Sequence, residues 1–323
     1  MISFIVIGRN EGNKINKCIS SIFDAIKENK ITDYEIIYVD SNSTDNSIMN
    51  ALQYDNIIVF KITGYYNAAI ARNIGYLESS GEYLLFMDGD MELFSTFIPV
   101  IFDDSFKLKY DFVSGDIINC YYDYNGKYIR NAFYYNNKKL TKDYYTTTTG
   151  GIFAIKRNIW LLVNGMTPKY RRSQDLDFGL RLSRKRIFLL RKHELVVRHN
   201  TISYFNNTRM LHLLINGDLL YRGILYRDHI LNSHMYPILF RSDYTLLILC
   251  FIIFFSTITG YFGLFLIYLF SIFGRSFPQS GENIFTGIMK RILFNLVKDI
   301  QVLFSILFFF PKKNYQLNYI RIK

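Results

Sequence analysis

Thirty consecutive residues, Tyr244 to Phe273, contain no charged side chain. A helix needs about 20 apolar residues to cross the hydrocarbon core of a bilayer, and this run is longer. Charged residues are instead well mixed through about residue 200. The sequence therefore predicts a folded N-terminal domain over residues 1–200, a helical juxtamembrane connector over 201–243, and a membrane-associated hydrophobic region with a basic tail over 244–323.

The path of the uncharged run is open at this point. It could form one long tilted helix, or two short segments that turn near Thr257 to Gly260. A second apolar stretch, Ile292 to Phe310, contains Lys298 and Asp299. That stretch could be an interfacial helix or a span. The sequence thus predicts C-terminal membrane or interfacial helices without fixing the number of crossings.

The formal net charge of +11 suits an anionic partner. No recognised nucleic-acid module is found, so we expect membrane lipids and not nucleic acid to be that partner. Lys and Arg beside an anionic leaflet contribute on the order of 1 kcal/mol each. The basic residues that flank the apolar segments are Arg241, Arg275, Lys290, Arg291, Lys312 and Lys313.

The N-terminus and the cysteines indicate the compartment. Residues 1–12 lack the basic lead and the long apolar stretch of a secretory signal, so we expect the first domain to face the cytoplasm. The three cysteines, Cys18, Cys120 and Cys250, are far apart and odd in number. They indicate neither a disulfide framework nor a metal cluster.

The first 90 residues alternate short apolar runs with helical patterns. Strands are expected at Ile2 to Ile7, Tyr34 to Val39, Ile57 to Ile62 and Tyr83 to Met87, with helices over about 15–26 and 67–79. This alternation predicts an α/β fold with a mainly parallel sheet and helices on both faces. Ligands of such sheets bind beyond the carboxyl ends of the strands, where Asp40, Asp88 and Asp90 are expected.

The triplet Asp88-Gly89-Asp90 follows an apolar run. In extended chain, residues two apart project to the same side, so both carboxylates can approach one cation. Oxygen ligands favour Mg²⁺ or Mn²⁺. The alternative is an ordinary Asp-Gly turn between strands.

Several ordered segments resemble the glycosyltransferases of family 2, which have the Rossmann-like GT-A fold. The segments are Ile5 to Gly12, Val39 to Ser47, Ala71 to Gly75, Gly81 to Asp90, Thr149 to Ile155, Asn164-Gly165 and Gln174 to Leu182. The resemblance covers roughly residues 1 to 200. It implies transfer of a sugar from a UDP- or GDP-sugar.

Roles for single residues follow from the resemblance, position by position. It implies that Asn10, Glu11, Asp40 and Arg72 contact the nucleotide, that Asp88 contacts the ribose or the metal, that Asp90 binds the metal and that Asp175 is the general base. His199 is a further candidate metal ligand, since neutral imidazole can complete a metal shell.

Structural roles remain open for the same residues. Asp175 could instead be a helix cap or a favourable acid in a first turn. Arg72 could lie on a solvated helix face, and Asp40 could form an Asx turn at the end of a strand. Asp177, two residues after Asp175, points elsewhere if the segment is helical. Arg171 and Arg172 could engage phosphate, although a solvated loop is favoured.

The function expected from the sequence is a metal-dependent inverting glycosyltransferase bound to a membrane, with its catalytic domain on the cytoplasmic face. Its acceptor would be a hydroxyl or phosphate of a lipid-linked, polysaccharide or other glycan. One alternative is a nucleotidyltransferase that acts on a sugar phosphate. Another is a catalytically inactive, membrane-bound nucleotide-binding scaffold.

Overall fold

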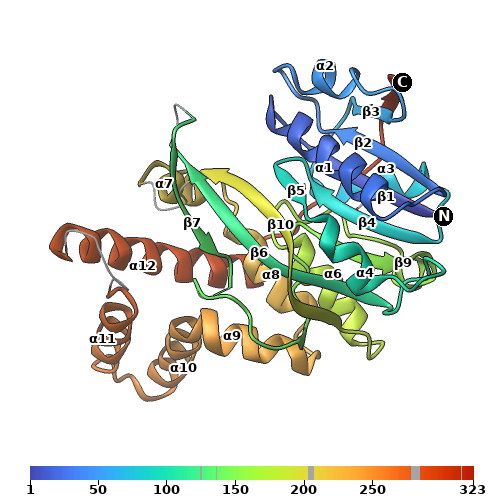
Figure 1. Ribbon diagram of the computed structural model, residues 1–323. Coiled ribbons are helices and arrows are strands. Elements are labelled where there is room, and N and C mark those ends of the chain that lie inside the picture. The colour runs from blue at the N-terminus through green and yellow to red at the C-terminus, as the bar shows by residue number, and fades with distance from the viewer. Residues whose placement is uncertain (124–125, 136, 203–206, 278–283, 314) are drawn as a thin grey trace. The chain divides into compact units, whose positions relative to one another are not determined.

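The computed structural model describes residues 1–323 except 124–125, 136, 203–206, 278–283 and 314. The chain forms two compact units, and each is described by itself (Figure 1). The N-terminal unit comprises residues 1–170, 174–203 and 312–323. The helical unit comprises residues 171–173 and 204–311.

The N-terminal unit contains one mixed sheet with helices. Its strands are β1 (Ile2–Gly8), β2 (Tyr34–Asp40), β3 (Ile58–Ile62), β4 (Tyr83–Asp88), β5 (Met91–Leu93), β6 (Phe112–Tyr122), β7 (Tyr128–Phe133), β8 (Tyr144–Thr146), β9 (Phe153–Lys156), β10 (Leu189–Ile202) and β11 (Tyr319–Arg321). Its helices are α1 (Lys14–Glu28), α2 (Ser47–Ala51), α3 (Ala68–Leu77), η1 (Ser95–Phe97), α4 (Ile98–Ile101), α5 (Arg157–Leu162) and α6 (Gln174–Ser183).

The strand order is β11-β3-β2-β1-β4-β9-β6-β10-β5, with β7 beside β6 and β8 beside β10. Strands β3, β2, β1 and β4 are mutually parallel, which is the part that the first 90 residues predict. The sheet becomes mixed beyond β4, because β9 pairs antiparallel with β4 and with β6. The chain leaves β1 toward β2 and later returns to its other side as β4, so the carboxyl ends of β1 and β4 form a switch point.

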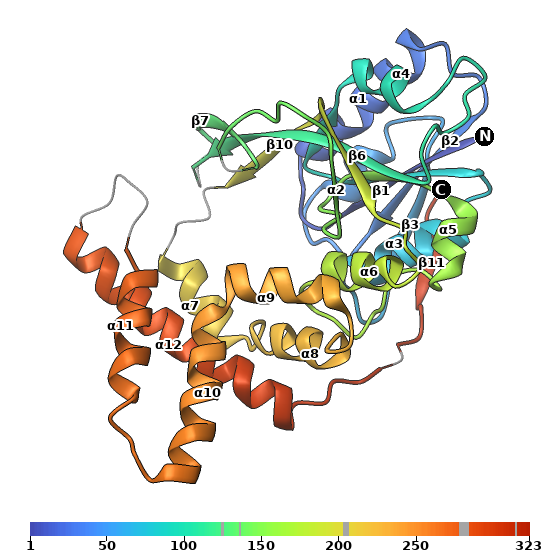
Figure 2. The same ribbon diagram turned by 90° about the horizontal axis from the view of Figure 1, so that it is seen from below.

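Two apolar clusters cover the two faces of the sheet. Successive residues of a strand point to opposite faces, and β1 shows this: Phe4 and Val6 pack with α1, whereas Ile5 and Ile7 pack with α3, α5 and α6. Figure 2 shows α1 on one side of the sheet and α3, α5 and α6 on the other. The predicted α/β architecture with helices on both faces of the sheet is confirmed.

One part of the sheet was not anticipated. The sequence predicts no regular element for residues 121–145, yet β6 extends to Tyr122 and pairs with β7. The 14-residue strand β10 runs parallel to β6 over most of its length, with register shifts between Arg191 and Val197. A strand with such shifts loses the strict alternation by which strands are recognised in a sequence.

The described residues of the helical unit form α7 (Asn207–Ile215), α8 (Leu220–Asp228), η2 (Ser233–Met235), α9 (Tyr236–Ser242), α10 (Tyr244–Thr259), α11 (Phe265–Arg275) and α12 (Ile284–Phe308). The uncharged run is therefore two short helices and not one. Gly260 ends α10 in the left-handed conformation, with φ of 69°, and only glycine adopts it at no steric cost. The break falls where the sequence allowed a turn.

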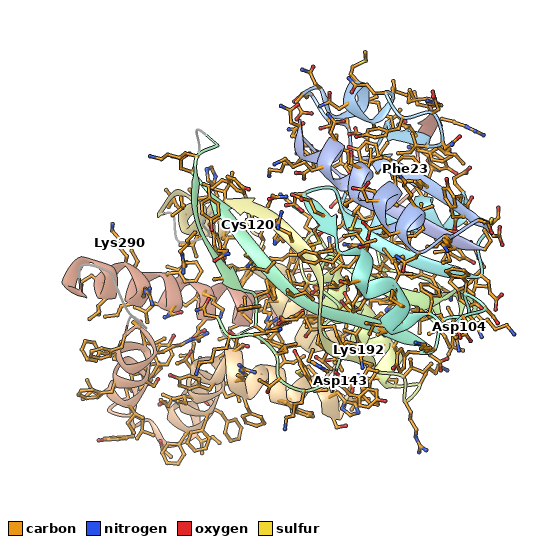
Figure 3. All side chains as sticks on the ribbon, viewed as in Figure 1. Phe23, Asp104, Cys120, Asp143, Lys192 and Lys290 are labelled. Carbon is orange, nitrogen blue, oxygen red and sulfur yellow. The ribbon has the colours of Figure 1, made fainter. Side chains whose placement is uncertain are left out.

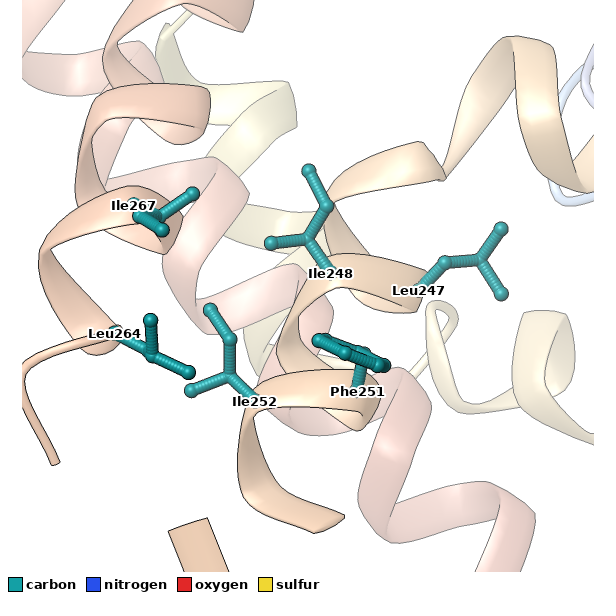
Figure 4. Close-up of a pocket in the computed structure, with 6 residues that line it drawn as sticks. All are labelled: Leu247, Ile248, Phe251, Ile252, Leu264 and Ile267. Atoms are coloured by element: carbon teal, nitrogen blue, oxygen red, sulfur yellow. The ribbon is translucent and has the colours of Figure 1, made fainter. Parts of the chain in front are cut away.

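An apolar pocket of about 370 Å³ lies between α10 and α11, lined by Leu247, Ile248, Phe251, Ile252, Leu264 and Ile267 (Figure 4). In the described part of the chain, no single helix combines the length and the apolar composition of a membrane span. The consecutive helices Ser233–Ser242 and Tyr244–Thr259, bent by 95°, meet those criteria together, by length and composition only.

The residues 312–323 were assigned to the membrane region from the sequence, but in the structure they join the N-terminal unit. Strand β11 pairs antiparallel with β3, so that Tyr319 lies opposite Ile62. The ring of Tyr315 stacks on Tyr65 with centroids 4.2 Å apart. Alternating apolar side chains explain this departure, because Tyr315, Leu317 and Tyr319 all pack on the core that contains α3.

This pairing generates a stability prediction. The ring of Tyr319 packs edge-on against Phe60, and its hydroxyl donates to Glu78 Oε1 at 2.5 Å. Tyr319→Phe should cost about 1 kcal/mol of unfolding free energy for the hydrogen bond. Tyr319→Ala should cost roughly 2 kcal/mol more, below the value for a fully buried ring. Urea unfolding measures both, with the half-exposed Ile320→Ala as the control. Equal losses in all three variants would contradict a docked strand.

Candidate functional site

A pocket of about 280 Å³ opens at the switch point of the N-terminal unit. It is lined by Ile7, Gly8, Arg9, Glu11, Ser41, Tyr66, Asn67, Ala68, Asp88 and Asp90. The register of the sheet explains why these residues meet, because Gly8 lies opposite Asp40 on β2 and Ile7 lies opposite Asp88 on β4. The predicted crevice beyond the strand ends is therefore present.

Helix α3 supplies the cation nearest to Asp88. The side chain of Asn67 caps this helix by accepting from the backbone N–H of Ile70 at 2.9 Å. One turn later, Arg72 Nη2 donates to Asp88 Oδ1 at 2.6 Å. Arg72 is 4% exposed, so the solvated-face alternative is wrong. Its guanidinium is placed on Asp88, while direct contact with a nucleotide base stays a prediction.

Three carboxylates share the pocket and repel one another. Burial, together with the charge of Asp90, raises the pKa of Glu11 to about 7, while Lys14 acts in the opposite direction. Burial also raises the pKa of Asp88 to about 6, against the effect of Arg72 and with that of Asp90. Deprotonating all three therefore costs free energy, which a bound cation would recover.

His199 completes one side of this acidic group. Its Nε2 lies 3.1 Å from Asp90 Oδ2, and its Nδ1 lies 2.8 Å from Asn119 Oδ1. Burial acts to lower the pKa of His199, but its hydrogen bond with Asp90 raises it. A ring nitrogen held by a second partner is the usual arrangement of a metal-binding histidine. Asn119, on β6, was not identified from the sequence.

The geometry fits a divalent cation in part. Asp90 and His199 have adjacent ligand atoms, whereas the Oδ1 of Asp88 is held by Arg72. Within the described residues, these three side chains do not bring three ligand atoms within 4.8 Å of one another. Mg²⁺ and Mn²⁺ commonly take several ligands from water or from a substrate diphosphate, so a partial protein shell suits them.

Asp40 and Asn10 have structural partners. Asp40 is fully buried, and its carboxylate accepts from the Ser43 backbone N–H at 2.7 Å, from Ser43 Oγ at 2.5 Å and from the Tyr38 hydroxyl at 2.9 Å. Asn10 Oδ1 accepts from the backbone N–H of Thr44 at 2.9 Å. Asn10 thus holds the loop after β1 against the loop after β2, and Asp40 closes the turn at the end of β2. For Asp40 the structure favours the Asx-turn alternative.

Asp175 lies in the first turn of α6, half-buried, with no hydrogen bond to any described residue. Its negative charge contributes to the raised pKa of Asp88, so the two carboxylates are electrostatic neighbours. Asp177, in contrast, is buried and pairs with Arg181 at 2.9 Å. Of the two acids, Asp175 is therefore the one available to a substrate.

A glycine fixes the depth of α6. A Cβ built on Gly179 would lie 1.7 Å from the carbonyl oxygen of Thr147, so any other residue would push the helix away. Gly151 allows a similarly close approach to strand β4, because a Cβ built on it would lie 2.3 Å from Asp88 Oδ2. Arg191 anchors the loop just before Gly151 by donating to Thr148 O at 2.7 Å. Arg191 was missed because a buried arginine on β10 has no local signal.

The pocket lining also contains an aromatic and a basic side chain that the sequence analysis missed. The guanidinium of Arg9 lies over the ring of Tyr66, 4.4 Å from its centroid. The loop that carries Tyr66 is held by the C-terminal tail, since the Thr63 backbone N–H donates to Asn318 O at 2.8 Å. A ring and a guanidinium offer flat surfaces on which a nucleotide base can stack.

A second acidic group lies elsewhere in the N-terminal unit. Asp143, His193 and Glu194 bring ligand atoms within 4.8 Å of one another. However, Lys192 Nζ lies 2.5 Å from Asp143 Oδ2, as Figure 3 allows the reader to follow. Burial opposes the effect, but hydrogen bonds from Lys192 and His193 lower the pKa of Asp143 to about 2. An ammonium group already neutralises this cluster, so a metal would have to displace it.

Comparison with known proteins shows which family the N-terminal residues match. Residues 3–162 match the sequence model described as Glycosyl transferase family 2. The chain carries a family 2 glycosyltransferase domain. The matched range contains β1 to β4, Asp88 and Asp90, whereas Asp175 and His199 lie after its end.

Curated relatives share this glycosyltransferase domain over limited lengths. Over 93 residues, 28% of both chains, the protein is 36% identical to the poly(ribitol-phosphate) beta-N-acetylglucosaminyltransferase TarP of Staphylococcus aureus. It is 32% identical to the glycosyltransferase AglE of Haloferax volcanii over 28% of this chain and 30% of that one. An uncharacterised glycosyltransferase of Haemophilus influenzae is 23% identical over 56% of this chain and 62% of its own. All three matches cover less than two thirds of the relative.

A solved structure, GalNAc-T7 with UDP, GalNAc and Mn²⁺, also resembles the chain. The TM-score is 0.49 at 15% identity, over 70% of this chain and 50% of that one.

The buried turn at Asp40 generates a prediction about this glycosyltransferase domain. Asp40→Asn replaces an acceptor oxygen with a donor amide opposite Ser43 or Tyr38, so unfolding should become easier by about 1–3 kcal/mol. Urea unfolding measures the loss, and Asp55→Asn, at an exposed carboxylate, is the matched control. Isothermal titration with UDP provides the second measurement. Lost nucleotide affinity at unchanged stability would instead show that Asp40 contacts the nucleotide directly.

Proposed function

We propose that the protein is a metal-dependent inverting glycosyltransferase that uses a UDP- or GDP-sugar. The observation that carries the proposal is the meeting of Glu11, Asp88 and Asp90 at the switch point of a family 2 domain, with Asp175 close enough to influence the charge of Asp88. Three acids in one pocket repel a diphosphate unless a cation joins them. The arrangement therefore fits a nucleotide donor that arrives with a metal.

Each residue has a defined task in the proposed reaction. Asp90 and His199, with Asp88, would hold Mg²⁺ or Mn²⁺, which when bound neutralises the negative charge that grows on the departing nucleoside diphosphate. Arg72 keeps Asp88 oriented through its hydrogen bond. Asn10 and Glu11 would contact the donor from the loop after β1. Arg9 and Tyr66, which also line the pocket, would contact the nucleotide base.

Asp175 would act as the general base. It would accept the proton of the acceptor hydroxyl or phosphate while that oxygen attacks the anomeric carbon and the bond from that carbon to the diphosphate breaks. Direct displacement inverts the anomeric configuration. The acceptor is proposed to be a lipid-linked, polysaccharide or other glycan. The similarity to TarP, a poly(ribitol-phosphate) beta-N-acetylglucosaminyltransferase, supports an acceptor that carries phosphate.

The helical unit supports a membrane location. Large apolar side chains are exposed along α10 and α11, including Phe254 at 66% and Phe270 at 75%. Contiguous exposed apolar surface on this scale marks a surface for a membrane or a partner. Helix α10 has 16 residues and a length of about 24 Å, less than the hydrocarbon core of about 30 Å. We therefore propose that the α10–α11 hairpin enters the membrane from the cytoplasmic face and returns.

Product analysis tests the reaction against both alternatives. The detergent-purified protein is incubated with UDP- and GDP-sugars, with Mg²⁺ or Mn²⁺, and with excess chelator. Release of nucleoside diphosphate that stops in chelator and returns with metal supports the proposal. Release of pyrophosphate from a nucleoside triphosphate and a sugar phosphate would identify a nucleotidyltransferase. Nucleotide binding without any turnover would identify an inactive scaffold, and full activity in chelator would overturn the metal assignment.

The role of Asp175 generates a separate prediction. Asp175→Asn should keep its affinity for the donor nucleotide but lower kcat by about 10² to 10⁴-fold, because a base acts on the acceptor. Asp177→Asn, on the same helix but paired with Arg181, is the control and should change stability more than kcat. Steady-state kinetics and UDP titration measure both. A wild-type kcat in Asp175→Asn would show that the residue is only a favourable charge in the first turn.

Membrane attachment is tested by sedimentation. The full-length protein should sediment with membranes and stay there in high salt, because insertion and not charge holds it. Phe254→Lys with Phe270→Lys should release it, since a charged residue at the centre of a membrane helix costs about 2.5–3.5 kcal/mol. Leu161→Lys, at an exposed site on α5, is the control. Release of the wild-type protein by salt alone would contradict insertion.

A further inference from the structure

A second polar pocket lies within the helical unit. Its volume is about 240 Å³, and it is lined by Arg172, Ser173, Leu213, Asp218, Leu219, Arg222, Phe294 and Lys298. Three of these eight side chains are basic, from the segment before α6, from α8 and from α12. A pocket whose polar lining is mainly cationic is suited to an anion.

A buried carboxylate outside the pocket lining holds two of the cations in place. Asp243, between α9 and α10, is 1% exposed. Its Oδ2 accepts from Arg222 Nε at 3.0 Å, and its Oδ1 accepts from the ammonium of Lys298. Arg222 Nε is also 2.8 Å from the hydroxyl of Tyr226. These contacts fix both side chains before any ligand arrives, which lowers the entropy that binding would cost.

The same contacts leave donors for a ligand. The hydrogen bonds of Arg222 to described residues all use Nε, so its two terminal nitrogens donate to none of them. Lys298 carries three N–H donors, and the one hydrogen bond found for it among the described residues goes to Asp243. A guanidinium fork beside an ammonium matches the oxygens of a phosphate group.

The charges around the pocket do not cancel. Asp218, the one carboxylate in its lining, lies 3.4 Å from Arg171 outside the lining. Behind the pocket, Asp243 and Asp299 face three cations, Arg222, Lys298 and Arg275. Basic groups therefore outnumber acidic ones behind the pocket, and an anion would improve the charge balance.

Chain connectivity relates the pocket to the proposed base. Ser173 lines the pocket and is two positions before Asp175. Two residues of fully extended chain span at most about 7 Å, so this limit holds for any arrangement of the two units. The Cα atoms of Ser173 and Asp175 are therefore at most about 7 Å apart.

We propose that this pocket binds the phosphate group of a phosphorylated acceptor, which Arg172, Arg222 and Lys298 contact. Leu213, Leu219 and Phe294 supply an apolar side for the carbon chain that carries the phosphate. The assignment of this ligand as the acceptor rests on the proposed function. Phosphate binding itself does not, so the two can be tested apart.

The binding test uses full-length protein in detergent with excess chelator, so that the acidic donor pocket has no metal to bind phosphate. Isothermal titration compares farnesyl phosphate, farnesol and glycerol 3-phosphate. Tighter binding of farnesyl phosphate than of the other two indicates a lipid-linked phosphate, and equal binding of both phosphates indicates that the phosphate alone is recognised. Absence of binding by both phosphates would overturn the proposal.

Variants locate the binding. Arg172→Ala, at an exposed side chain, should keep the fold and weaken phosphate binding about tenfold, as expected for a lost charge-assisted contact. Arg222→Lys keeps the charge that faces Asp243 but loses the fork, and should weaken binding similarly. Lys290→Ala, at an exposed lysine two turns before Lys298 on α12, is the control (Figure 3). Equal weakening in the control would show non-specific charge attraction and contradict the site.

A kinetic measurement tests the link to the acceptor. If the reaction is established, Arg172→Ala should raise the KM for a phosphorylated acceptor about tenfold, with the KM for the nucleotide sugar unchanged. An unchanged acceptor KM, in a variant that has lost phosphate binding, would remove the acceptor role. If no nucleotide sugar is turned over, the proposed function fails, and the titrations still decide whether the pocket binds phosphate.

Discussion

Mutual repulsion among Glu11, Asp88 and Asp90 is the constraint that the N-terminal unit is built to withstand. Burial and this repulsion together raise the pKa values of Glu11 and Asp88, because both disfavour the ionised forms. Arg72 relieves part of it at Asp88, and His199 relieves part at Asp90. What remains is a local excess of negative charge in a pocket of nucleotide size. Such a site gains most from a ligand that brings positive charge.

Separate elements of the N-terminal unit meet at the site. Asp88 ends a central strand, His199 lies on β10, and Asp175 lies at the start of α6, so three distant parts of the chain supply the proposed metal, donor and acceptor groups. Gly151 and Gly179 let backbone approach where a side chain would not fit. The positions of the acids are thus fixed by packing of the scaffold and not by the flexible parts of the loops. Preorganised charge of this kind is the largest single contribution to most enzymatic rates.

The sequence was informative where local pattern and chemistry coincide. Alternating strand and helix periods placed β1 to β4 closely, and the Asp-Gly-Asp triplet placed Asp88 and Asp90 in the pocket. It was uninformative where a long-range contact decides the outcome. Nothing near Asp40 shows that Tyr38 and Ser43 will occupy its carboxylate, and nothing near Tyr319 shows that it will pair with β3 across more than 250 residues. Which groups bond to a buried carboxylate, and which strand pairs at the edge of a sheet, depend on the assembled fold. The spacing of residues in the sequence does not reveal it.

The two pockets have opposite charge, and this difference has a chemical consequence. Under the two proposals, a diphosphate would enter the acidic pocket of Asp88 and Asp90 only with a cation, whereas a phosphate would enter the basic pocket of Arg222 and Lys298 without one. The two pockets would therefore discriminate between donor and acceptor phosphates by metal dependence as well as by shape. The acidic pocket would repel a phosphate that arrives without a cation, and the basic pocket would repel the cation that accompanies the donor.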